Sequence, residues 1–138
     1  MNWQYLAGYF DGEGWIIFYG ENAIHLGVAQ KSPAKVIYQV KDFLTEQGFI
    51  PNINLWNNGT TDMVTLLMRR TLENVIFLKM ISPYLIEKKE KAILAIERLE
   101  QHIKTKGKMR PFRKLSEKLE SATSQEVGFE YQNKRLLF

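Results

Sequence analysis

The sequence predicts an α+β domain in which helices pack on one face of a mostly antiparallel sheet. Segments with helical periodicity alternate with pairs of strand-like segments, in the order α-β-β-α-β-β-α-α-α. Short turn sequences join the strands within each pair, as in hairpins. The 138 residues are 45% hydrophobic and 12% aromatic, which is enough for one domain with a core. The second face of the sheet is expected to be open.

The first helix is predicted from Asn2 to about Asp11, with Asn2 as its N-cap. Trp15 to Tyr19 is rich in aromatic and β-branched residues and predicts a strand. Residues 20–22 contain a turn signal, and the chain is expected to return as a second strand from Ile24 to Gln30.

A second helix is predicted to begin at Ser32-Pro33, since serine caps helices and proline suits the first helical position. Gly48 is expected to end it. Its apolar residues follow helical spacing and form one stripe, which consists of Val36, Ile37, Val40, Phe43 and Leu44.

Two further strands are predicted at Ile50–Trp56 and Met63–Arg69, around an Asn-Gly hairpin turn in residues 57–60. Thr71 to Met80 then predicts a third helix. Ser82-Pro83 repeats the serine-proline start.

The fourth helix is predicted to run from Ser82-Pro83 to about Ile103. Residues 104–108 then form a linker, and a last helix covers about Pro111 to Ser121. The chain therefore divides into a core at residues 1–103 and a basic C-terminal helical extension of the same domain at residues 104–138.

The charge is uneven along the chain, although the net charge is only +4. Residues 1–103 hold 10 Lys and Arg against 11 Asp and Glu, a net of −1, whereas residues 104–138 hold 9 against 4, a net of +5. A basic tail of this kind contacts nucleic acid or simply keeps the protein soluble, and composition alone leaves both open.

Several classes of protein are excluded or disfavoured by composition. The absence of cysteine excludes disulfides and thiolate metal sites. The sequence contains no run of about 18 apolar residues, so no membrane span is expected. The N-terminus lacks the pattern of a signal peptide. We therefore expect a soluble intracellular protein with no membrane partner.

The most informative segment is Leu6-Ala7-Gly8-Tyr9-Phe10-Asp11-Gly12-Glu13-Gly14. It opens as a helix whose small residues would let a second helix approach closely. It ends in two acids, and an acid at a helix tip could hold a divalent metal. Dimerisation and chemistry are thus expected from one segment.

This nonapeptide resembles the LAGLIDADG motif. The Leu-Ala-Gly start, both acids and the closing glycine coincide, and the predicted element order is that of the LAGLIDADG homing endonucleases. The resemblance covers roughly residues 1–103 and implies an αββαββα fold with a saddle-shaped antiparallel sheet over DNA, followed here by extra C-terminal helices. Family members with one motif are homodimers, which implies a dimer interface at Leu6, Ala7, Gly8, Asp11 and Gly12.

The resemblance also implies a metal site. The last acid of the motif, Glu13, would bind Mg²⁺ or another divalent metal such as Mn²⁺, and the backbone carbonyl of Gly12 would be a second ligand. Asp11 matches the acid that supports the helix end, and it is an additional candidate ligand. Glu13 stands where the family more often has aspartate, so its carboxylate lies one methylene further from the backbone.

Three polar residues are implied near the cleavage site. Gln30 matches a glutamine that orders water, and Lys88 matches a lysine five residues after a Pro-aromatic-Leu segment. Ala34 occupies the place of a basic residue, so Lys35 is the substitute, whereas Lys31 is expected to face away. The alternative is that these residues are ordinary polar groups on a strand end and on helix surfaces.

Strand alternation predicts which side chains read DNA bases, because neighbouring residues face opposite sides of a sheet. Lys35 and the basic stretch are expected to bind phosphates, with Lys106, Lys108 and Arg110 as candidates. Three apolar residues, Trp15, Ile17 and Leu67, make the proposed face less polar than expected; either they meet thymine methyls or the facing slips by one residue. The candidate base-reading residues are Tyr19, His25, Asn52, Asn54, Trp56, Thr65 and Arg69.

These expectations combine into one leading function. The chain is predicted to be a homodimeric, metal-dependent endonuclease that cuts double-stranded DNA at a long, partly palindromic site, and it looks intron-encoded. The alternative is a nucleic-acid binder that does not cleave, such as an intron RNA maturase or a DNA-binding regulator, since the fold supports both.

Overall fold

The computed structural model describes residues 1–20 and 23–106 and confirms the predicted α+β architecture. The predicted helix at residues 111–121 lies outside the described residues. So do the predicted phosphate-binding residues Lys108 and Arg110. The elements are α1 (Trp3–Glu13), β1 (Gly14–Tyr19), β2 (Ala23–Lys31), α2 (Lys35–Glu46), β3 (Asn52–Asn57), β4 (Asp62–Met68), α3 (Thr71–Ile81), the 3-10 helix η1 (Ser82–Tyr84) and α4 (Lys89–Lys106).

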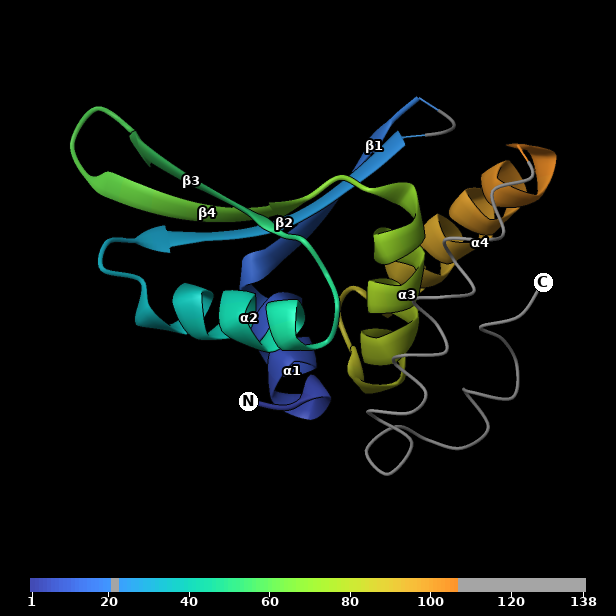
Figure 1. Cartoon of the computed structure of the whole chain (residues 1–138), viewed down its shortest axis with the longest axis horizontal. Coiled ribbons are helices and arrows are strands. Elements are labelled where there is room, and N and C mark those ends of the chain that lie inside the picture. Colours follow the sequence, from blue (N-terminus) through green and yellow to red (C-terminus); the bar gives the residue numbers. More distant parts are fainter. Residues whose placement is uncertain (21–22, 107–138) are drawn as a thin grey trace.

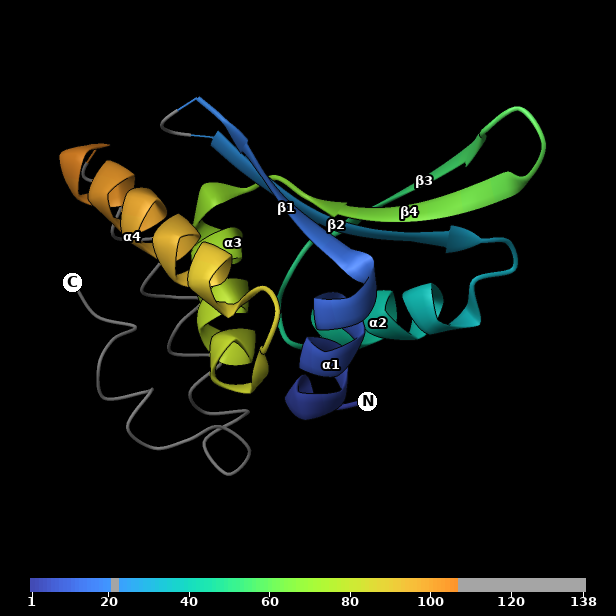
Figure 2. The ribbon, with the colours of Figure 1, turned by 180° about the vertical axis from the view of Figure 1, so that it is seen from behind.

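The four strands form one antiparallel sheet in the order β1-β2-β4-β3. Helices α1 to α4 lie on one side of this sheet (Figure 1). The tips of both hairpins rise away from the helices, so the opposite side is concave and no described helix covers it (Figure 2). We call this side the uncovered face.

Burial confirms the predicted facing of the strands. The side chains that point toward the helices are buried, among them Ile16 in β1 and Val64 in β4. Ile17, Tyr19 and Asn52 point the other way and are exposed. The sheet has therefore not slipped by one residue, because such a slip would exchange the two sets.

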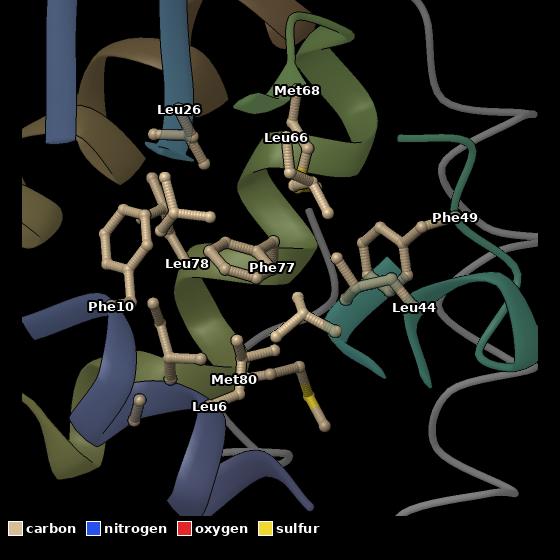
Figure 3. Packing of buried hydrophobic residues seen from close by; sticks show 14 of the residues in the cluster. Leu6, Phe10, Leu26, Leu44, Phe49, Leu66, Met68, Phe77, Leu78 and Met80 are labelled. Atoms are coloured by element: carbon tan, nitrogen blue, oxygen red, sulfur yellow. The ribbon is translucent and has the colours of Figure 1, made fainter. Parts of the chain in front are cut away.

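The core is built around α3, whose residues from Glu73 to Ile81 are all buried. Phe77 lies at its centre (Figure 3). Its ring packs edge to face against Phe10 of α1, with 5.5 Å between the ring centroids. It packs in the same way against Trp3 and Phe49, with centroid distances of 6.3 and 6.4 Å. A helix buried on every side is largely apolar, which explains why its sequence shows no polar stripe; its three buried polar residues, Glu73, Asn74 and Lys79, each have a partner.

Two polar groups on α3 fix its position. The Nδ2 group of buried Asn74 donates to the carbonyl of Ile24 in β2 at 2.9 Å and to that of Met68 in β4 at 3.3 Å. Lys79 forms an ion pair with Glu100 of α4. These contacts join the central helix to the sheet above it and to the helix beside it.

The predicted start of α2 at Ser32-Pro33 is wrong. The helix begins at Lys35, and its N-cap is Ala34, which has a φ of 51° and provides no side-chain hydrogen bond. The reason is that Ser32, in the turn directly after β2, is held against β4, since its backbone N–H donates to the carbonyl of Asp62 at 2.9 Å. The Ser32-Pro33 peptide bond is cis.

Ser82-Pro83 does begin a helical turn, but only the short η1, and α4 starts seven residues later at Lys89. The predicted linker at residues 104–108 is also partly wrong, because α4 continues to Lys106. At the N-terminus, Asn2 caps α1 as predicted, since its side chain accepts a hydrogen bond from Tyr5 N–H, and the helix extends to Glu13.

The segment between η1 and α4 is held by Asp11, near the end of α1. One carboxylate oxygen accepts hydrogen bonds from the N–H groups of Ile86 and Glu87 at 3.0 and 3.1 Å, and the other accepts from Lys88 N–H at 2.9 Å. In return, Lys88 Nζ donates to the carbonyl of Asp11 at 2.6 Å. We call this set of four hydrogen bonds the Asp11 clamp.

The clamp changes the acidity of Asp11. Burial alone would raise the pKa of its carboxyl, but the hydrogen bonds from the N–H groups of Lys88, Glu87 and Ile86, together with the Lys88 charge, outweigh burial and lower it. The carboxylate is thus the form that the fold stabilises.

One glycine allows an aromatic ring to lie on the uncovered face. Gly27 in β2 is paired with Trp15 in β1, and the indole ring packs over it. A Cβ atom at position 27 would lie 2.5 Å from Trp15 Cζ2 and 2.9 Å from the backbone oxygen of Leu66. Both distances are shorter than a Cβ contact allows.

We therefore expect Gly27→Ala to destabilise the protein by about 1–3 kcal/mol, because the ring or the strand must move. Urea unfolding would measure the change. In a Trp15→Leu background the same substitution should cost clearly less, since the ring has gone. An equal cost in both backgrounds would show that the indole is not the obstacle.

A second prediction concerns the Asp11 clamp. Asp11→Asn should lower the free energy of unfolding by about 1–3 kcal/mol at pH 7, because hydrogen bonds to a charged acceptor are lost. The carboxylate stabilises the fold fully above its ordinary pKa of 3.8, and this contribution is lost as the pH falls through the lowered pKa of the folded state.

The difference between wild type and Asp11→Asn should accordingly shrink below about pH 4. Asp42→Asn is the matched control, since this exposed acid of α2 accepts no such hydrogen bonds from residues 1–20 and 23–106. A deficit of the Asp11 variant that stays constant down to pH 2 would contradict the clamp.

Candidate functional site

Glu13 ends α1 at a place where the sheet is incomplete. β1 begins at Gly14, which pairs with Val28 of β2. β2 continues for three more residues, Ala29 to Lys31, which pair only with β4 on their other side. The end of α1 therefore lies next to a strand edge that β1 does not cover.

A hollow of about 500 Å³ opens at this edge. Three of the residues predicted from sequence line it, namely Glu13, Gln30 and Lys35. Lys31 lines it too, contrary to the expectation that it faces away. We call this the Glu13 hollow; its remaining lining residues are Ala29, Ala34 and Val36.

The hollow combines one acidic residue with two basic residues. Glu13, Lys31 and Lys35 are all exposed, so an incoming anion or cation can reach them. The charge of Glu13 also affects Tyr9, whose pKa is raised to about 12 mainly by burial and next by this carboxylate. Tyr9 is therefore a neutral phenol at physiological pH and not a source of charge.

The residues present fit a magnesium ion only in part. Glu13 offers a free carboxylate, and the carbonyl of Gly12 belongs to the last turn of α1, where helix carbonyls lack intrahelical partners. Asp11 is engaged by three N–H groups, which weakens its candidacy as a ligand. Within residues 1–20 and 23–106, no three His, Asp or Glu side chains gather into a metal-binding cluster.

A single carboxylate is still compatible with Mg²⁺, which keeps several waters and accepts substrate phosphate oxygens as ligands. The remaining ligands would have to come from a substrate or from a second copy of the chain.

Lys88 contacts Asp11 of the motif, but it is not among the residues that line the Glu13 hollow. Its Nζ group is bonded to the carbonyl of Asp11 at 2.6 Å, so it neutralises the negative end of the α1 dipole. The structure therefore gives Lys88 a structural contact next to the site, and its predicted catalytic role stays a prediction.

Several predicted base-reading residues share the uncovered face. Asn52 and Asn54 of β3 are exposed there, and their side chains form no hydrogen bond with another residue in the described part of the chain. At the other hairpin, the rings of Tyr19 and His25 are in contact, with their centroids 4.4 Å apart and their planes tilted by 46°. Burial, and next the nearby charge of Arg69, lowers the pKa of His25. His25 is hence predominantly neutral at pH 7.

Thr65 and Trp56 differ from the other candidates because they bind each other. The indole Nε1 of Trp56 donates to the hydroxyl of Thr65 at 2.7 Å. Thr65 is buried, so direct base contact by its hydroxyl is not supported, whereas Trp56 remains 46% exposed and presents its ring on the uncovered face. The sequence did not show this pairing, although the two residues lie nine apart across the predicted hairpin.

The predicted dimer residues fall on two sides of α1. Leu6 and Ala7 are 1% and 0% exposed, because they share the core-facing stripe with Trp3 and Phe10. Their side chains are therefore directed at the core of the protomer, and their place at an interface stays a prediction. Gly8 and Gly12 do face outward, where a Cβ on either would meet nothing within 4 Å.

Tyr5 is exposed on the outward face of α1 and was missed by the sequence analysis. The signal was available, since positions 5, 8 and 12 follow helical spacing. Asp11 is half-buried in its clamp.

The basic candidates are only partly described. Lys35 is exposed at the first turn of α2, and Lys106 is the last residue of α4. None of the described helices is long and apolar enough to cross a membrane.

Comparison with known proteins gives structural matches only. No family model and no curated protein sequence matches the chain. Two solved structures of the homing endonuclease I-CvuI match it, each with 18% sequence identity.

In the first structure I-CvuI is bound to the I-CreI target in the presence of 2 mM Mg, with the DNA not cleaved; the TM-score is 0.57, and the match covers 71% of this chain and 65% of that one. In the second it is bound to its own target in 2 mM Ca; the TM-score is 0.60, and the match covers 91% and 82%. The order of the elements, the antiparallel sheet and these matches agree: the chain has the fold of the homing endonucleases.

Proposed function

We propose that the chain is a homodimeric, site-specific endonuclease that hydrolyses double-stranded DNA with the help of Mg²⁺ or Mn²⁺. The observation that carries the proposal is the Glu13 hollow. It sets the exposed terminal acid of the motif beside Gln30 and two lysines, at the edge of the uncovered sheet face. In the matching structures, a protein of this fold is bound to a DNA target.

DNA would lie on the uncovered face. This face is concave and carries exposed amides, which can bond adenine bidentately in the major groove. Trp15 and Ile17 belong to it as well, and they would lie against thymine methyl groups. Phosphate contacts by lysines and arginines would supply affinity without sequence information.

Dimerisation follows from the number of free acids. One chain offers one free carboxylate at the motif, whereas cutting two strands requires a site on each. A two-fold axis along the outward face of α1, through Gly8 and Gly12, would bring the second Glu13 close to the first. The two acids would then flank the axis, each next to one strand.

In the reaction, the oxygen of a water molecule bonds to phosphorus and one phosphorus–oxygen ester bond breaks, which leaves a phosphate on one strand end and a hydroxyl on the other. Glu13 would hold the metal, and Gln30 would orient the attacking water. The metal supplies Lewis-acid stabilisation of the phosphate and lowers the pKa of water. The lysines of the hollow would face the phosphate and stabilise its charge.

A second candidate is a nucleic-acid binder that does not cleave, such as an intron RNA maturase or a DNA-binding regulator. The contact of Lys88 favours it, because the lysine implied for catalysis is bonded to the carbonyl of Asp11. An intron-encoded origin would suit both candidates, and the position of the gene inside an intron would support it.

The test of cleavage is Glu13→Gln. Wild type, given Mg²⁺ and DNA spanning candidate intron-insertion sites, should produce double-strand breaks. The variant should cut about 100-fold more slowly or not at all, while DNA binding measured in Ca²⁺ stays within about threefold, because the amide cannot replace the anionic ligand. Glu46→Gln, an exposed acid at the end of α2, is the matched control.

Intact DNA at every candidate site, with splicing of the intron RNA stimulated instead, would overturn the endonuclease proposal in favour of the maturase.

A separate prediction tests the dimer. Gly8→Leu should leave the protomer folded, since the position is open and leucine favours a helix over glycine by nearly 1 kcal/mol. It should nevertheless weaken dimerisation at least tenfold, because the two helices could no longer approach closely. Light scattering over a concentration series would measure this.

Gln101→Leu places the same side chain on the exposed surface of α4 and controls for added hydrophobicity. A Gly8→Leu dimer as tight as the wild-type one would place the interface elsewhere.

A further inference from the structure

We propose that Lys31 is a catalytic residue of this site, whose ammonium group contacts a non-bridging oxygen of the phosphate that is cut. This inference rests on the proposed endonuclease function and assigns a role to a residue that the sequence reasoning set aside. Four observations on the structure carry it.

The first observation is the direction of the side chain. In β2, Gly27, Ala29 and Lys31 alternate with Val28 and Gln30. Val28 is buried against the helices. The strand alternation therefore directs Lys31 toward the uncovered face, where DNA would lie, and directs Gln30 toward the helices.

The second observation is proximity to the acid. Lys31 lines the Glu13 hollow together with Glu13 itself. An ammonium group and a carboxylate that line one open hollow, at the margin of a DNA-binding face, can approach the same phosphate from two sides. Lys31 is exposed, so a substrate can reach it.

The third observation is a fixed backbone. Lys31 pairs with Met63 of β4, and the next residue, Ser32, donates its N–H to the carbonyl of Asp62 at 2.9 Å. The last residue of β2 is thus held by the sheet on one side, while the side toward Glu13 stays open. A lysine on such a strand reaches the site at little cost in backbone ordering.

The fourth observation is the state of the other cations. Within the described part of the chain, Lys31 has no ion-pair or hydrogen-bond partner for its side chain. Lys88 is bonded to the carbonyl of Asp11, and position 34 carries a buried alanine. Lys35 lines the same hollow, but it begins α2, which lies in the helix layer (Figure 1).

The chemistry required of Lys31 is electrostatic. As the water oxygen bonds to phosphorus, negative charge grows on the non-bridging oxygens. A fixed ammonium group within hydrogen-bond distance stabilises that charge more strongly than the charge of the ground state. Lys31 transfers no proton in this step; the proton of the water passes to solvent, and the leaving oxygen takes its proton from solvent.

The experiment compares Lys31→Met, Lys31→Arg and Lys41→Met on a DNA that the wild type cuts. Under single-turnover conditions Lys31→Met should cut about 100-fold more slowly, whereas its dissociation constant in Ca²⁺ should rise by about tenfold at most, because the contact is stronger in the transition state than in the ground state. Lys31→Arg should recover most of the rate, because it restores a cation. Lys41→Met changes a lysine of α2 that does not line the Glu13 hollow, and it should change the rate by less than about threefold.

A second measurement reports on contact rather than on folding. A methylphosphonate at the cleaved linkage removes the charge of that phosphate. In Ca²⁺, wild type should bind this DNA about tenfold more weakly than normal DNA, and Lys31→Met should show little of that loss, because its partner charge is already absent.

Wild-type cleavage rates in Lys31→Met, or an equal methylphosphonate penalty in both proteins, would overturn the role of Lys31 and leave the endonuclease function standing. A wild-type protein that binds DNA and cuts none of it would overturn both.

Discussion

The site depends on the hydrogen bonds by which Asp11 holds the start of α4. Without them, the end of α1 would have unpaired carbonyls, and the segment at residues 86–88 would have unpaired N–H groups. The clamp satisfies both sets and fixes the direction in which α1 ends. The position of Glu13, two residues later at the end of α1, depends on that direction. One acid of the motif is thus a structural acceptor, which leaves the other free for chemistry.

A second constraint is the difference between the two faces of the sheet. The helix-facing side is anchored by Asn74, which bonds both central strands from α3, and by the aromatic cluster around Phe77. The uncovered side is correspondingly free to carry exposed amides and rings. β2 extends three residues beyond the end of its pairing with β1. These residues of β2 therefore form one wall of the Glu13 hollow, while the rest of the strand lies in the middle of the sheet. Fold and site therefore share one element.

Much of the fold could be predicted from the sequence, since hydrophobic spacing reports which side of each element is buried. The apolar stripe of α2 and the alternation in β1 and β4 were predicted correctly for this reason. Helix starts were predicted less well. Ser32 and Ser82 both have side chains that commonly cap helices. The backbone N–H of Ser32, however, is hydrogen-bonded to the sheet, and the segment that precedes α4 is hydrogen-bonded to Asp11. Contacts between residues far apart in sequence overrode local preference in both cases.

The sequence by itself determined the fold class and the single motif, and it identified Glu13 as the candidate acid, because these depend on periodicity and on residue identity. The tertiary structure decided how the other residues divide their roles. Leu6 and Ala7 face the core, Lys88 is bonded to Asp11, Thr65 is bonded to Trp56, and Lys31 joins the hollow. Each of these outcomes depends on a neighbour brought in by folding, and no local pattern records which neighbour arrives.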